Sequence, residues 1–516
     1  MKHKEAFNGV VVLTAALIVI KILSAVYRIP YQNILGDTGL YAYQQVYPIV
    51  ALGMILSMNA IPSAITQNIG KYHSDEAYAK AVAYIQLVGM LLFIAIFVFA
   101  NNIAHMMGDS HLTPMIQAAS LSFIFIGMLG VLRGYYQSAN NMTVPAISQV
   151  IEQVIRVGII IVTIVIFVDR GWTIYEAGTI AILASTIGFL GSSIYLVAHR
   201  PFKFKMVNNT AKIVWKQFAL SVLIFAISQL IVILWQVIDS VTIIKSLQAI
   251  RVPFDVAITE KGVYDRGASF IQMGLIVTTT FSFALIPLLS DAIKMNNQVL
   301  MNRYANASLK ITILISTAAG IGLINLLPLM NGVFFKTNDL TLTLSVYMIT
   351  VICVSLIMMD MALLQAQHAV RPIFVGMTAG LVIKFILNII LIRLSGIIGA
   401  SISTVVSLII FGTIIHIAVT RKYHLHAMRR FFINVVLGMV FMSIVVQCVL
   451  NVVTTHGRIT GLIELLCAAV LGIIALFFYI FRFNVLTYKE LTYLPFGSKL
   501  YQIKKGRRHI PLRLLA

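Results

Sequence analysis

The chain has 516 residues, of which 59% are hydrophobic and only 11% are charged. Soluble domains are about 45–50% apolar and about 25% charged, so this composition excludes a soluble protein. The net charge of +21 comes mainly from bases in short connections and in the C-terminal tail, a pattern that sets membrane topology beside anionic lipid and does not indicate nucleic-acid binding.

The hydrophobic residues fall in runs of roughly 20, the length that spans about 30 Å of hydrocarbon. Strand-like alternation is absent, and backbone groups in hydrocarbon must be paired internally, so the sequence predicts an all-α polytopic membrane protein. We place fourteen transmembrane helices at approximately 8–34, 41–69, 80–101, 113–138, 145–168, 174–198, 214–240, 265–290, 304–329, 340–367, 371–393, 396–420, 430–453 and 458–482.

Lys and Arg are concentrated in alternate connections and in the tail. This bias predicts that both termini are cytoplasmic and that the number of spans is even. The longest connection, Val241–Arg266, is then an outside loop, with a short surface helix as the alternative for this segment. The basic segment HRPFKFKMVNNTAK (199–212) is a cytoplasmic linker between the sixth and seventh spans.

Two stretches of the chain resemble each other weakly. Ala60-Ile61-Pro62 ends the second span much as Leu285-Ile286-Pro287 ends the eighth, and Gln137…Pro145…Arg156 matches Gln365…Pro372…Lys384 in order and spacing. The pattern predicts two six-helix lobes related by a pseudo-twofold axis along the membrane normal, a common transporter plan. The expected parts are an N-lobe (1–200), a basic cytoplasmic linker (201–213), a C-lobe (214–420), two extra C-terminal helices (421–482) and a basic cytoplasmic tail (483–516).

A polar stripe interrupts the fifth span. Gln149, Glu152, Gln153 and Arg156 are spaced i, i+3, i+4 and i+7, so they share one helical face. Arg156 lies about 16 Å beyond Pro145 at 1.5 Å per residue, near the bilayer centre, where an arginine costs roughly 2.5–3.5 kcal/mol. Glu152 at i−4 can pair with it. A purely structural ion pair between helices remains the alternative.

Other predicted spans carry polar residues too. In the first half these are Arg28, Asn59 and Arg133, and in the second half they are Asp239, Asp360, Lys384 and Asn388. Because membrane charges seldom face lipid, we expect these stripes to converge on a water-filled cavity. Bases outnumber acids in the first half, which suits an anionic ligand, and the Arg guanidinium matches phosphate oxygens by bidentate geometry.

Five tyrosines cluster near the outer ends of the first two spans: Tyr27, Tyr31, Tyr41, Tyr43 and Tyr47. An interfacial aromatic belt explains this position. Stacking on a sugar is the alternative interpretation.

Two of these stretches also resemble a known family. KILSAVYRIPYQNILGDTGLYAYQQVYPIV (21–50) and LRGYYQSANNMTVPAISQVIEQVIRV (132–157) are similar to the polysaccharide-biosynthesis transporters typified by stage V sporulation protein B. These transporters are relatives of the lipid II flippases in the multidrug/oligosaccharidyl-lipid/polysaccharide (MOP) exporter superfamily. The resemblance implies alternating access between two lobes and flipping of undecaprenyl-diphosphate-linked sugars to the outer leaflet.

The resemblance also implies roles for single residues. Arg28 matches a basic position that lines the central cavity, and the last two helices, at about 430–482, would shape a groove for the lipid tail. Asp239 matches an acid that holds a sodium ion in some members. Lys384 stands where those members have a cation ligand, which departs from the pattern of a sodium site.

We therefore expect a flippase for a lipid II-like cell-wall precursor, with no enzymatic activity, because no phosphate-cradling loop, zinc spacing or soluble catalytic domain is visible. No cofactor is expected, and the coupling ion, Na⁺ or H⁺, stays open. The alternatives are a drug or cation antiporter of the same superfamily and a non-transporting scaffold for cell-wall synthesis. The expected partners are the lipid-linked saccharide, membrane lipids and possible cell-wall enzymes, around a monomer in the cell membrane. The expected substrate-binding residues are Arg28, Asn59, Arg133, Gln149, Glu152, Gln153 and Arg156, and the expected coupling residues are Asp239, Asp360, Lys384 and Asn388.

Overall fold

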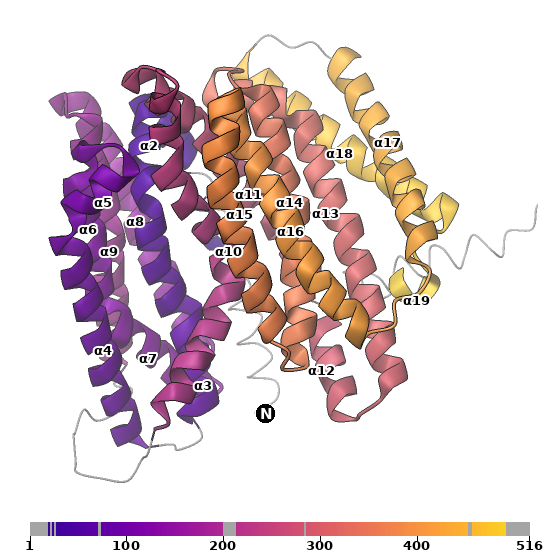
Figure 1. Cartoon of the computed structure of the whole chain (residues 1–516), viewed down its shortest axis with the longest axis horizontal. Coiled ribbons are helices and arrows are strands. Elements are labelled where there is room, and N and C mark those ends of the chain that lie inside the picture. The colour runs from indigo at the N-terminus through magenta and orange to yellow at the C-terminus, as the bar shows by residue number, and fades with distance from the viewer. Residues whose placement is uncertain are drawn as a thin grey trace, which may run out of the picture. The chain divides into compact units, whose positions relative to one another are not determined.

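The computed structural model describes residues 19–20, 23–24, 27–70, 74–199, 213–282, 285–452 and 457–491. Every regular element in these ranges is a helix, as the composition predicts (Figure 1). Most of the first predicted span, the basic linker 201–212 and the tail beyond residue 491 lie outside the described residues.

Contacts divide the chain into two compact units, Met1–Ser269 with Phe385–Ala400, and Phe270–Lys384 with Ser401–Ala516. These units do not test the predicted lobe boundaries, which stay a prediction. The helices of the first unit are α2 (Arg28–Ile55), the π-helix η1 (Leu56–Ala60), α3 (Ile61–Asn68), α4 (Asp75–Val98), α5 (Ala100–Met107), the 3-10 helix η3 (Ser110–Leu112), α6 (Thr113–Ser120), the 3-10 helix η4 (Leu121–Phe125), α7 (Ile126–Ser138), α8 (Thr143–Arg170), α9 (Ile174–Ala198), α10 (Trp215–Ala249), the start of α11 (Phe254–Ser282) and the end of α15 (Arg371–Ser395).

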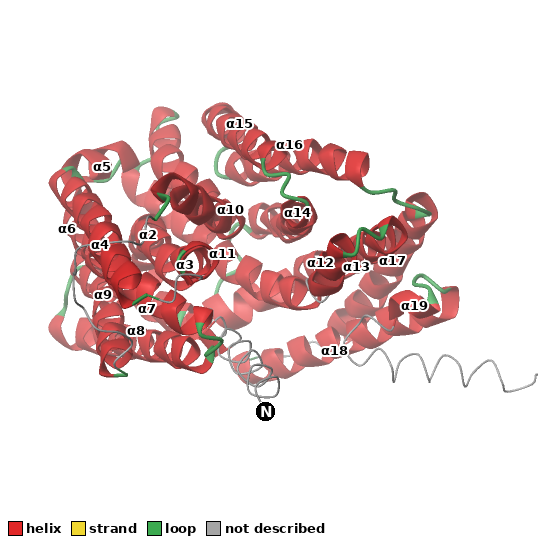
Figure 2. Ribbon diagram, turned by 90° about the horizontal axis from the view of Figure 1, so that it is seen from below, coloured by secondary structure: helices red, strands yellow, loops and turns green. Residues whose placement is uncertain are grey.

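The second unit contains the remaining parts of α11 and α15. Its other helices are α12 (Ile286–Lys294), α13 (Gln298–Phe335), α14 (Thr341–Ala366), α16 (Ile398–Lys422, of which the first turn belongs to the first unit), α17 (Met428–Val452), α18 (Arg458–Phe483) and α19 (Tyr488–Leu491). Within this unit α13 packs against α14, α17 and α18, which lie beside it in Figure 2.

Twelve helical stretches of the described chain are long and apolar enough to cross a membrane. The prediction of a polytopic all-α membrane protein is confirmed, but the count of fourteen spans is not. One reason is that α2 continues through the connection predicted between the first two spans. Gly36 has φ 75° and ψ −178° there, a conformation that glycine adopts without a Cβ penalty, so the chain is kinked between two helical segments.

The prediction of an outside loop at Val241–Arg266 is wrong. In the structure α10 runs on to Ala249 and α11 begins at Phe254, so only residues 250–253 connect them. Two of the charges that lowered the hydropathy of this stretch are paired within α11, because Lys261 Nζ lies 2.5 Å from Asp265 Oδ1 at i+4 spacing. A charged helical segment therefore replaces the expected loop.

Other boundaries agree closely with the sequence. The sixth span, predicted at 174–198, is helix α9, Ile174–Ala198. Its start is set by a capping box, in which Glu176 N donates to Thr173 Oγ1 at 3.2 Å and Thr173 N donates to Glu176 Oε2 at 2.8 Å.

One side of α4 is strongly apolar and uncovered. Within its own unit α4 packs against α6, α7 and η4, and the side chains turned away from these helices are uncovered. Side chains on this uncovered side are more than half exposed, which is expected for a surface that contacts acyl chains. They are Leu87, Val88, Leu91, Ile94 and Val98.

Candidate functional site

The polar stripe predicted on the fifth span lies on α8, within the first unit. Pro145 stands in the first turn of the helix, and Gly171 ends it with φ 64°. The four stripe side chains face the interior of the unit, because each is at most 2% exposed: Gln149, Glu152, Gln153 and Arg156.

Helix α9 approaches this face closely. A Cβ placed on Gly188 would lie 2.7 Å from the main-chain oxygen of Glu152, so only glycine permits this approach. The stripe is therefore enclosed by its neighbouring helix.

Glu152 holds two arginines. Its Oε1 accepts from Arg156 Nη2 at 3.1 Å, which is the predicted i−4 ion pair, and its Oε2 accepts from Arg133 Nη2 at 2.8 Å. All three side chains are at most 1% exposed. Arg133 lies on α7, so its place in this triad could not be derived from helical spacing alone.

Arg133 donates four hydrogen bonds to other groups of the protein. Besides Glu152 it donates to Ser148 Oγ at 3.0 Å, to Ser192 Oγ at 2.8 Å and to the main-chain oxygen of Ser57 at 3.3 Å. The side chain of Arg133 is 0% exposed, so its guanidinium lies wholly inside the unit.

The acceptor at Ser57 is explained by a local irregularity. Residues Leu56–Ala60 form a π-helix in which Ile61 N donates to the oxygen of Leu56, five residues back. The N–H that would reach the Ser57 oxygen by the same pattern belongs to Pro62, which has none. The guanidinium of Arg133 therefore satisfies a carbonyl that the π-turn leaves free.

Arg156 retains a buried donor beyond its bond to Glu152. Its Nη1 donates to Met54 Sδ at 2.9 Å, whereas its Nε has no hydrogen-bond partner among the described residues. Thioethers are weak acceptors. Two of the donors of Arg156 are thus poorly satisfied inside the helix bundle.

Arg28 is held by aromatic rings. Its guanidinium carbon lies 5.2 Å from the centre of the Tyr47 ring and 5.9 Å from that of Tyr27, both within cation–π range. The Nε and Nη1 groups of Arg28 have no hydrogen-bond partner in the described chain, although the side chain is only 1% exposed. Tyr43 and Tyr47 lie within electrostatic range of both Arg28 and Arg156, so the two predicted diphosphate ligands converge on one tyrosine pair.

These tyrosines do not form an interfacial belt. Tyr27, Tyr31, Tyr43 and Tyr47 are at most 6% exposed. Their rings pack on one another, with centroid distances of 5.3 Å between Tyr31 and Tyr43 and 5.8 Å between Tyr43 and Tyr47. The belt interpretation is therefore wrong for this group, because the rings surround a buried cation.

The remaining polar residues of the first half lie nearby along the same helices. Gln153 Nε2 donates to Ser24 Oγ at 2.9 Å, and the Oε1 atoms of Gln149 and Gln153 have no partner among the residues described. Asn59 lies in the π-helix η1 and is partly buried. The expected water-filled cavity is not open at the stripe, because these side chains are nearly inaccessible to solvent and the triad fills the space between α7, α8 and α9 with its own hydrogen bonds.

The coupling residues predicted in the second half have the following hydrogen bonds within each unit. In the first unit, Asp239 Oδ1 accepts from Asn388 Nδ2 at 2.8 Å and Asp239 Oδ2 accepts from Tyr264 at 3.1 Å. In the second unit, Lys384 Nζ donates to Ser403 Oγ at 3.2 Å and to Thr404 Oγ1 at 2.6 Å.

Asp360 belongs to another group of the second unit. Its Oδ2 lies 3.0 Å from Nδ1 of His416 on α16. Coupling and gating roles for these residues stay predictions.

An ion pair of the first unit was not predicted. Arg266 donates from Nε to Asp37 Oδ1 at 2.8 Å and from Nη2 to Asp37 Oδ2 at 2.5 Å, a bidentate arrangement. A Cβ on Gly262 would overlap the main-chain oxygen of Asp37, so α11 touches the chain directly after the Gly36 kink. The two residues are far apart in sequence. The sequence shows only that each is a charged residue within a helical stretch, and it does not show that they pair.

Comparison with known proteins agrees with this fold. Residues 6–293 match the family model described as polysaccharide biosynthesis protein. The chain is 31% identical over 524 residues to the membrane protein YabM of Bacillus subtilis, covering 98% of both chains. It is 25% identical over 439 residues to the lipid II flippase MurJ of that organism, covering 78% of this chain and 80% of that one. It is 30% identical over 224 residues to stage V sporulation protein B of Bacillus subtilis, covering 41% and 42% of the two chains.

Solved structures share the architecture at low sequence identity. The lipid II flippase MurJ in an inward closed conformation matches with a TM-score of 0.69 and 16% identity, covering 92% of this chain and 98% of that one. An inward-facing multidrug resistance MATE family transporter of the MOP superfamily matches with a TM-score of 0.61 and 15% identity, covering 78% and 94%. These likenesses show the fold, and the sequence matches show the family. The chain therefore belongs to the polysaccharide biosynthesis protein family, as a multi-pass membrane protein.

Proposed function

We propose that this protein flips a lipid-linked saccharide diphosphate, of the lipid II class, from the cytoplasmic to the outer leaflet. Its similarity to a lipid II flippase over 78% of the chain supports this substrate class. The observation that carries the proposal is the pair of buried arginines, Arg28 and Arg156, each of which keeps hydrogen-bond donors without partners among the described residues.

Such donors are costly unless a ligand uses them. A buried polar group without a partner costs about 1–3 kcal/mol, and more when it is charged. Arg28, Arg133 and Arg156 carry three positive charges against the one negative charge of Glu152. A diphosphate supplies both the missing acceptors and the missing negative charge, and guanidinium groups bind phosphate oxygens in bidentate fashion.

The three residues of the triad, Arg133, Glu152 and Arg156, have different roles. Arg133 uses its donors on groups of the protein, so it holds Glu152 in place without being available to substrate. Glu152 in turn fixes one side of the Arg156 guanidinium. Arg156 and Arg28 are then the residues that meet the diphosphate once the site opens.

Transport requires that this closed arrangement open to each leaflet in turn. The polyprenyl tail remains in lipid while the headgroup enters, and pairing with the arginines offsets the cost of taking phosphate charge out of water. No covalent bond is made or broken. We propose that Asp239 and Asn388 in the first unit, and Lys384 and Asp360 in the second, contribute to coupling with an ion gradient or the membrane potential.

The fold likeness to MATE transporters favours one rival, an antiporter for cationic drugs. A cationic substrate requires an acidic site, whereas the cluster around Arg28 and Arg156 carries surplus positive charge. A scaffold that transports nothing requires no buried donors at all. The arginine cluster therefore favours the flippase.

The test is a flipping assay with fluorescent lipid II in proteoliposomes. We compare the parent protein with Arg28→Ala, Arg156→Ala and the control Arg170→Ala, which removes a 72% exposed arginine at the end of the same helix α8. Loss of a hydrogen bond to a charged group, worth about 1.5–3 kcal/mol, predicts a flipping rate lowered roughly 10- to 100-fold for the first two variants. The control is expected to flip at the parental rate.

Other outcomes separate the alternatives. Parental rates for both buried-site variants would contradict the assignment of the site. Uptake of a fluorescent cation by a parent protein that flips no lipid II would identify the antiporter. If vesicles shown to contain folded protein have neither activity, the scaffold is the remaining interpretation.

A further inference from the structure

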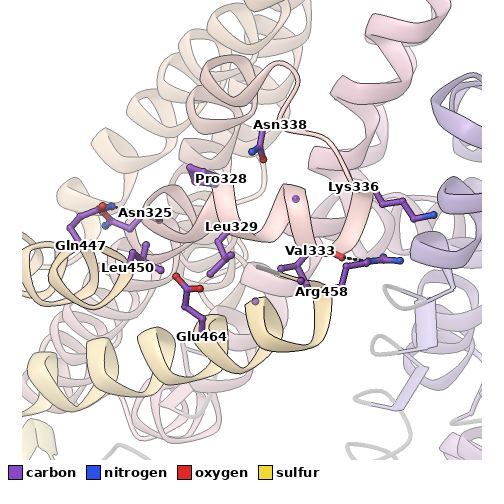
Figure 3. Close-up of a pocket in the computed structure, with 13 residues that line it drawn as sticks. Asn325, Pro328, Leu329, Val333, Lys336, Asn338, Gln447, Leu450, Arg458 and Glu464 are labelled. Atoms are coloured by element: carbon purple, nitrogen blue, oxygen red, sulfur yellow. Dashed lines mark hydrogen bonds between the residues drawn. The ribbon is translucent and has the colours of Figure 1, made fainter. Parts of the chain in front are cut away.

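A second polar site lies in the second unit, away from the triad. The ends of α13, α17 and α18 line an open cavity of about 630 Å³, which is within the 300–1,000 Å³ typical of small-molecule sites (Figure 3). Its walls combine apolar side chains, such as Pro328, Leu329 and Leu450, with charged residues of both signs.

One end of the cavity is acidic and rich in amides. Glu464 of α18 is only 7% exposed, although it lies in a helix apolar enough to cross the membrane. Asn325 Nδ2 donates to Ser443 Oγ at 2.9 Å, and Gln447 Nε2 donates to Asn325 Oδ1 at 3.0 Å. Figure 3 shows Asn325, Gln447 and Glu464 at the same end. An ionisable residue at this depth marks a functional site by default.

The opposite end of the cavity is basic. Lys336 ends α13 in a left-handed conformation with φ 66°, and its side chain is exposed. Arg458 opens α18 and donates to the main-chain oxygens of Val333 at 3.0 Å and Phe334 at 3.2 Å, which fixes its guanidinium at the C-terminal end of α13. In Figure 3 both bases lie at the end away from Glu464 and the amides.

The surfaces beside the cavity are apolar and uncovered. Ile444 and Val452 of α17 are 57% and 81% exposed, and Ile459 and Ile463 of α18 are 79% and 57% exposed. A helix face of this kind in a membrane protein contacts acyl chains. A ligand that fits the whole site therefore combines a doubly charged headgroup with apolar chains.

We propose that this cavity binds a phospholipid whose headgroup carries both a phosphate and a primary ammonium group, as phosphatidylethanolamine does. The carboxylate of Glu464 accepts hydrogen bonds from the ammonium group, and Lys336 with Arg458 attracts the phosphate. The acyl chains lie along the exposed faces of α17 and α18. A purely anionic lipid would face the carboxylate of Glu464 with a like charge, and a simple cation would face Lys336 and Arg458 with a like charge.

This inference is independent of the proposed flipping of lipid II. It concerns a resident lipid held at the second unit, and its measurement is equilibrium binding. Failure of the flipping assay therefore leaves it standing, and its own failure leaves the arginine site untouched.

The test is native mass spectrometry of the full chain in detergent, titrated with dioleoyl phosphatidylethanolamine, phosphatidylcholine or phosphatidylglycerol. Trimethylation of the amine in phosphatidylcholine removes every N–H donor, so we expect the parent to bind phosphatidylethanolamine roughly tenfold more tightly than phosphatidylcholine. Glu464→Gln should bring that ratio to about one. Lys336→Ala should weaken both lipids to a similar extent and leave the ratio unchanged, because both carry the phosphate.

Matched controls come from the exposed helix α12. Lys294→Ala and Asp291→Asn remove a base and an acid that are 78% and 60% exposed, and both should bind as the parent does. A parent that binds the two zwitterionic lipids equally, or a Glu464→Gln variant that keeps the preference, overturns the proposal. Tighter binding of phosphatidylglycerol than of phosphatidylethanolamine also overturns it.

A filling variant tests the location without changing any charge. Gly332 lines the cavity, and a Cβ there would meet no atom nearer than Asn338 Oδ1 at 3.5 Å. Gly332→Leu should fold, because leucine favours a helix more than glycine does, and its side chain should occupy the cavity. We expect it to weaken phosphatidylethanolamine binding at least threefold, whereas parental affinity in this variant would place the lipid elsewhere.

Discussion

Helices α8 and α15 are the two copies of one predicted motif, and in each a buried basic side chain is stabilised by hydrogen-bond partners of a different kind. Each carries a proline in its first turn and a buried base about three turns further on, Arg156 in α8 and Lys384 in α15. Arg156 is bound to the carboxylate of Glu152 from its own helix. Lys384 donates to two hydroxyl groups of α16, Ser403 and Thr404.

The difference shows what a repeat preserves. Helical spacing preserves the depth at which a base lies, because the rise per residue is fixed. The partners of that base depend on the neighbouring helices. A carboxylate shared between Arg133 and Arg156 makes a buried charged cluster at α8, and at α15 the hydroxyl groups of Ser403 and Thr404 are among the groups that hold Lys384.

The largest expected effect comes from removing the shared carboxylate. Glu152→Gln leaves Arg133 and Arg156 buried without their counter-charge, and breaking a buried ion pair in this way costs about 3–5 kcal/mol. We expect a large fall in thermal stability in detergent, measured by the loss of monodisperse protein on heating. A Gln153→Glu change in the same background, which returns an acid one residue away, should restore little. Parental stability of Glu152→Gln would remove the distinction between α8 and α15.

A smaller effect is expected at the anchoring arginine. Arg133→Met leaves Glu152 paired with Arg156 but leaves the main-chain oxygen of Ser57 without its donor, at a cost of about 1–3 kcal/mol. The same thermal assay measures it. Hydrogen exchange should rise locally in the π-helix Leu56–Ala60, and unchanged exchange there would show that Arg133 does not hold this turn.

The hydroxyl partners of Lys384 should matter less. Thr404→Val removes the 2.6 Å bond from Lys384 while preserving the shape of the side chain, so we expect a loss of about 1.5 kcal/mol, at the lower end of the range for bonds to charged groups. The matched change Thr413→Val removes a hydroxyl that bonds only along its own exposed helix surface. If Thr404→Val cost as much as Glu152→Gln, the two helices would be energetically alike.

The smallest effect is expected from exposed charges. Lys80 and Glu76 form a 2.9 Å pair on α4 with side chains 32% and 18% exposed, at i,i+4 spacing. Lys80→Ala should change stability by less than about 0.5 kcal/mol, because partly exposed pairs are screened by solvent and salt. A larger loss of stability would show that the number of ion pairs, and not their burial, determines the order of these effects.

The sequence by itself determined the class of fold, most helix boundaries, the stripe on α8 and the pair between Glu152 and Arg156. These follow from hydropathy and from the fixed pitch of a helix, which act over one or two turns. The sequence failed at residues 241–266, where polar side chains were taken as a loop, because hydropathy does not show whether charges are paired along a helix.

Only the tertiary structure decided which distant residues meet. It brought Arg133 to Glu152, buried the tyrosines of α2 with the rings of Tyr27 and Tyr47 against Arg28, and matched Arg266 with Asp37. The two ion pairs join separate helices and depend on how closely their backbones approach, as at Gly188 and Gly262. Such distances are set by packing, and no periodicity within a single helix encodes them.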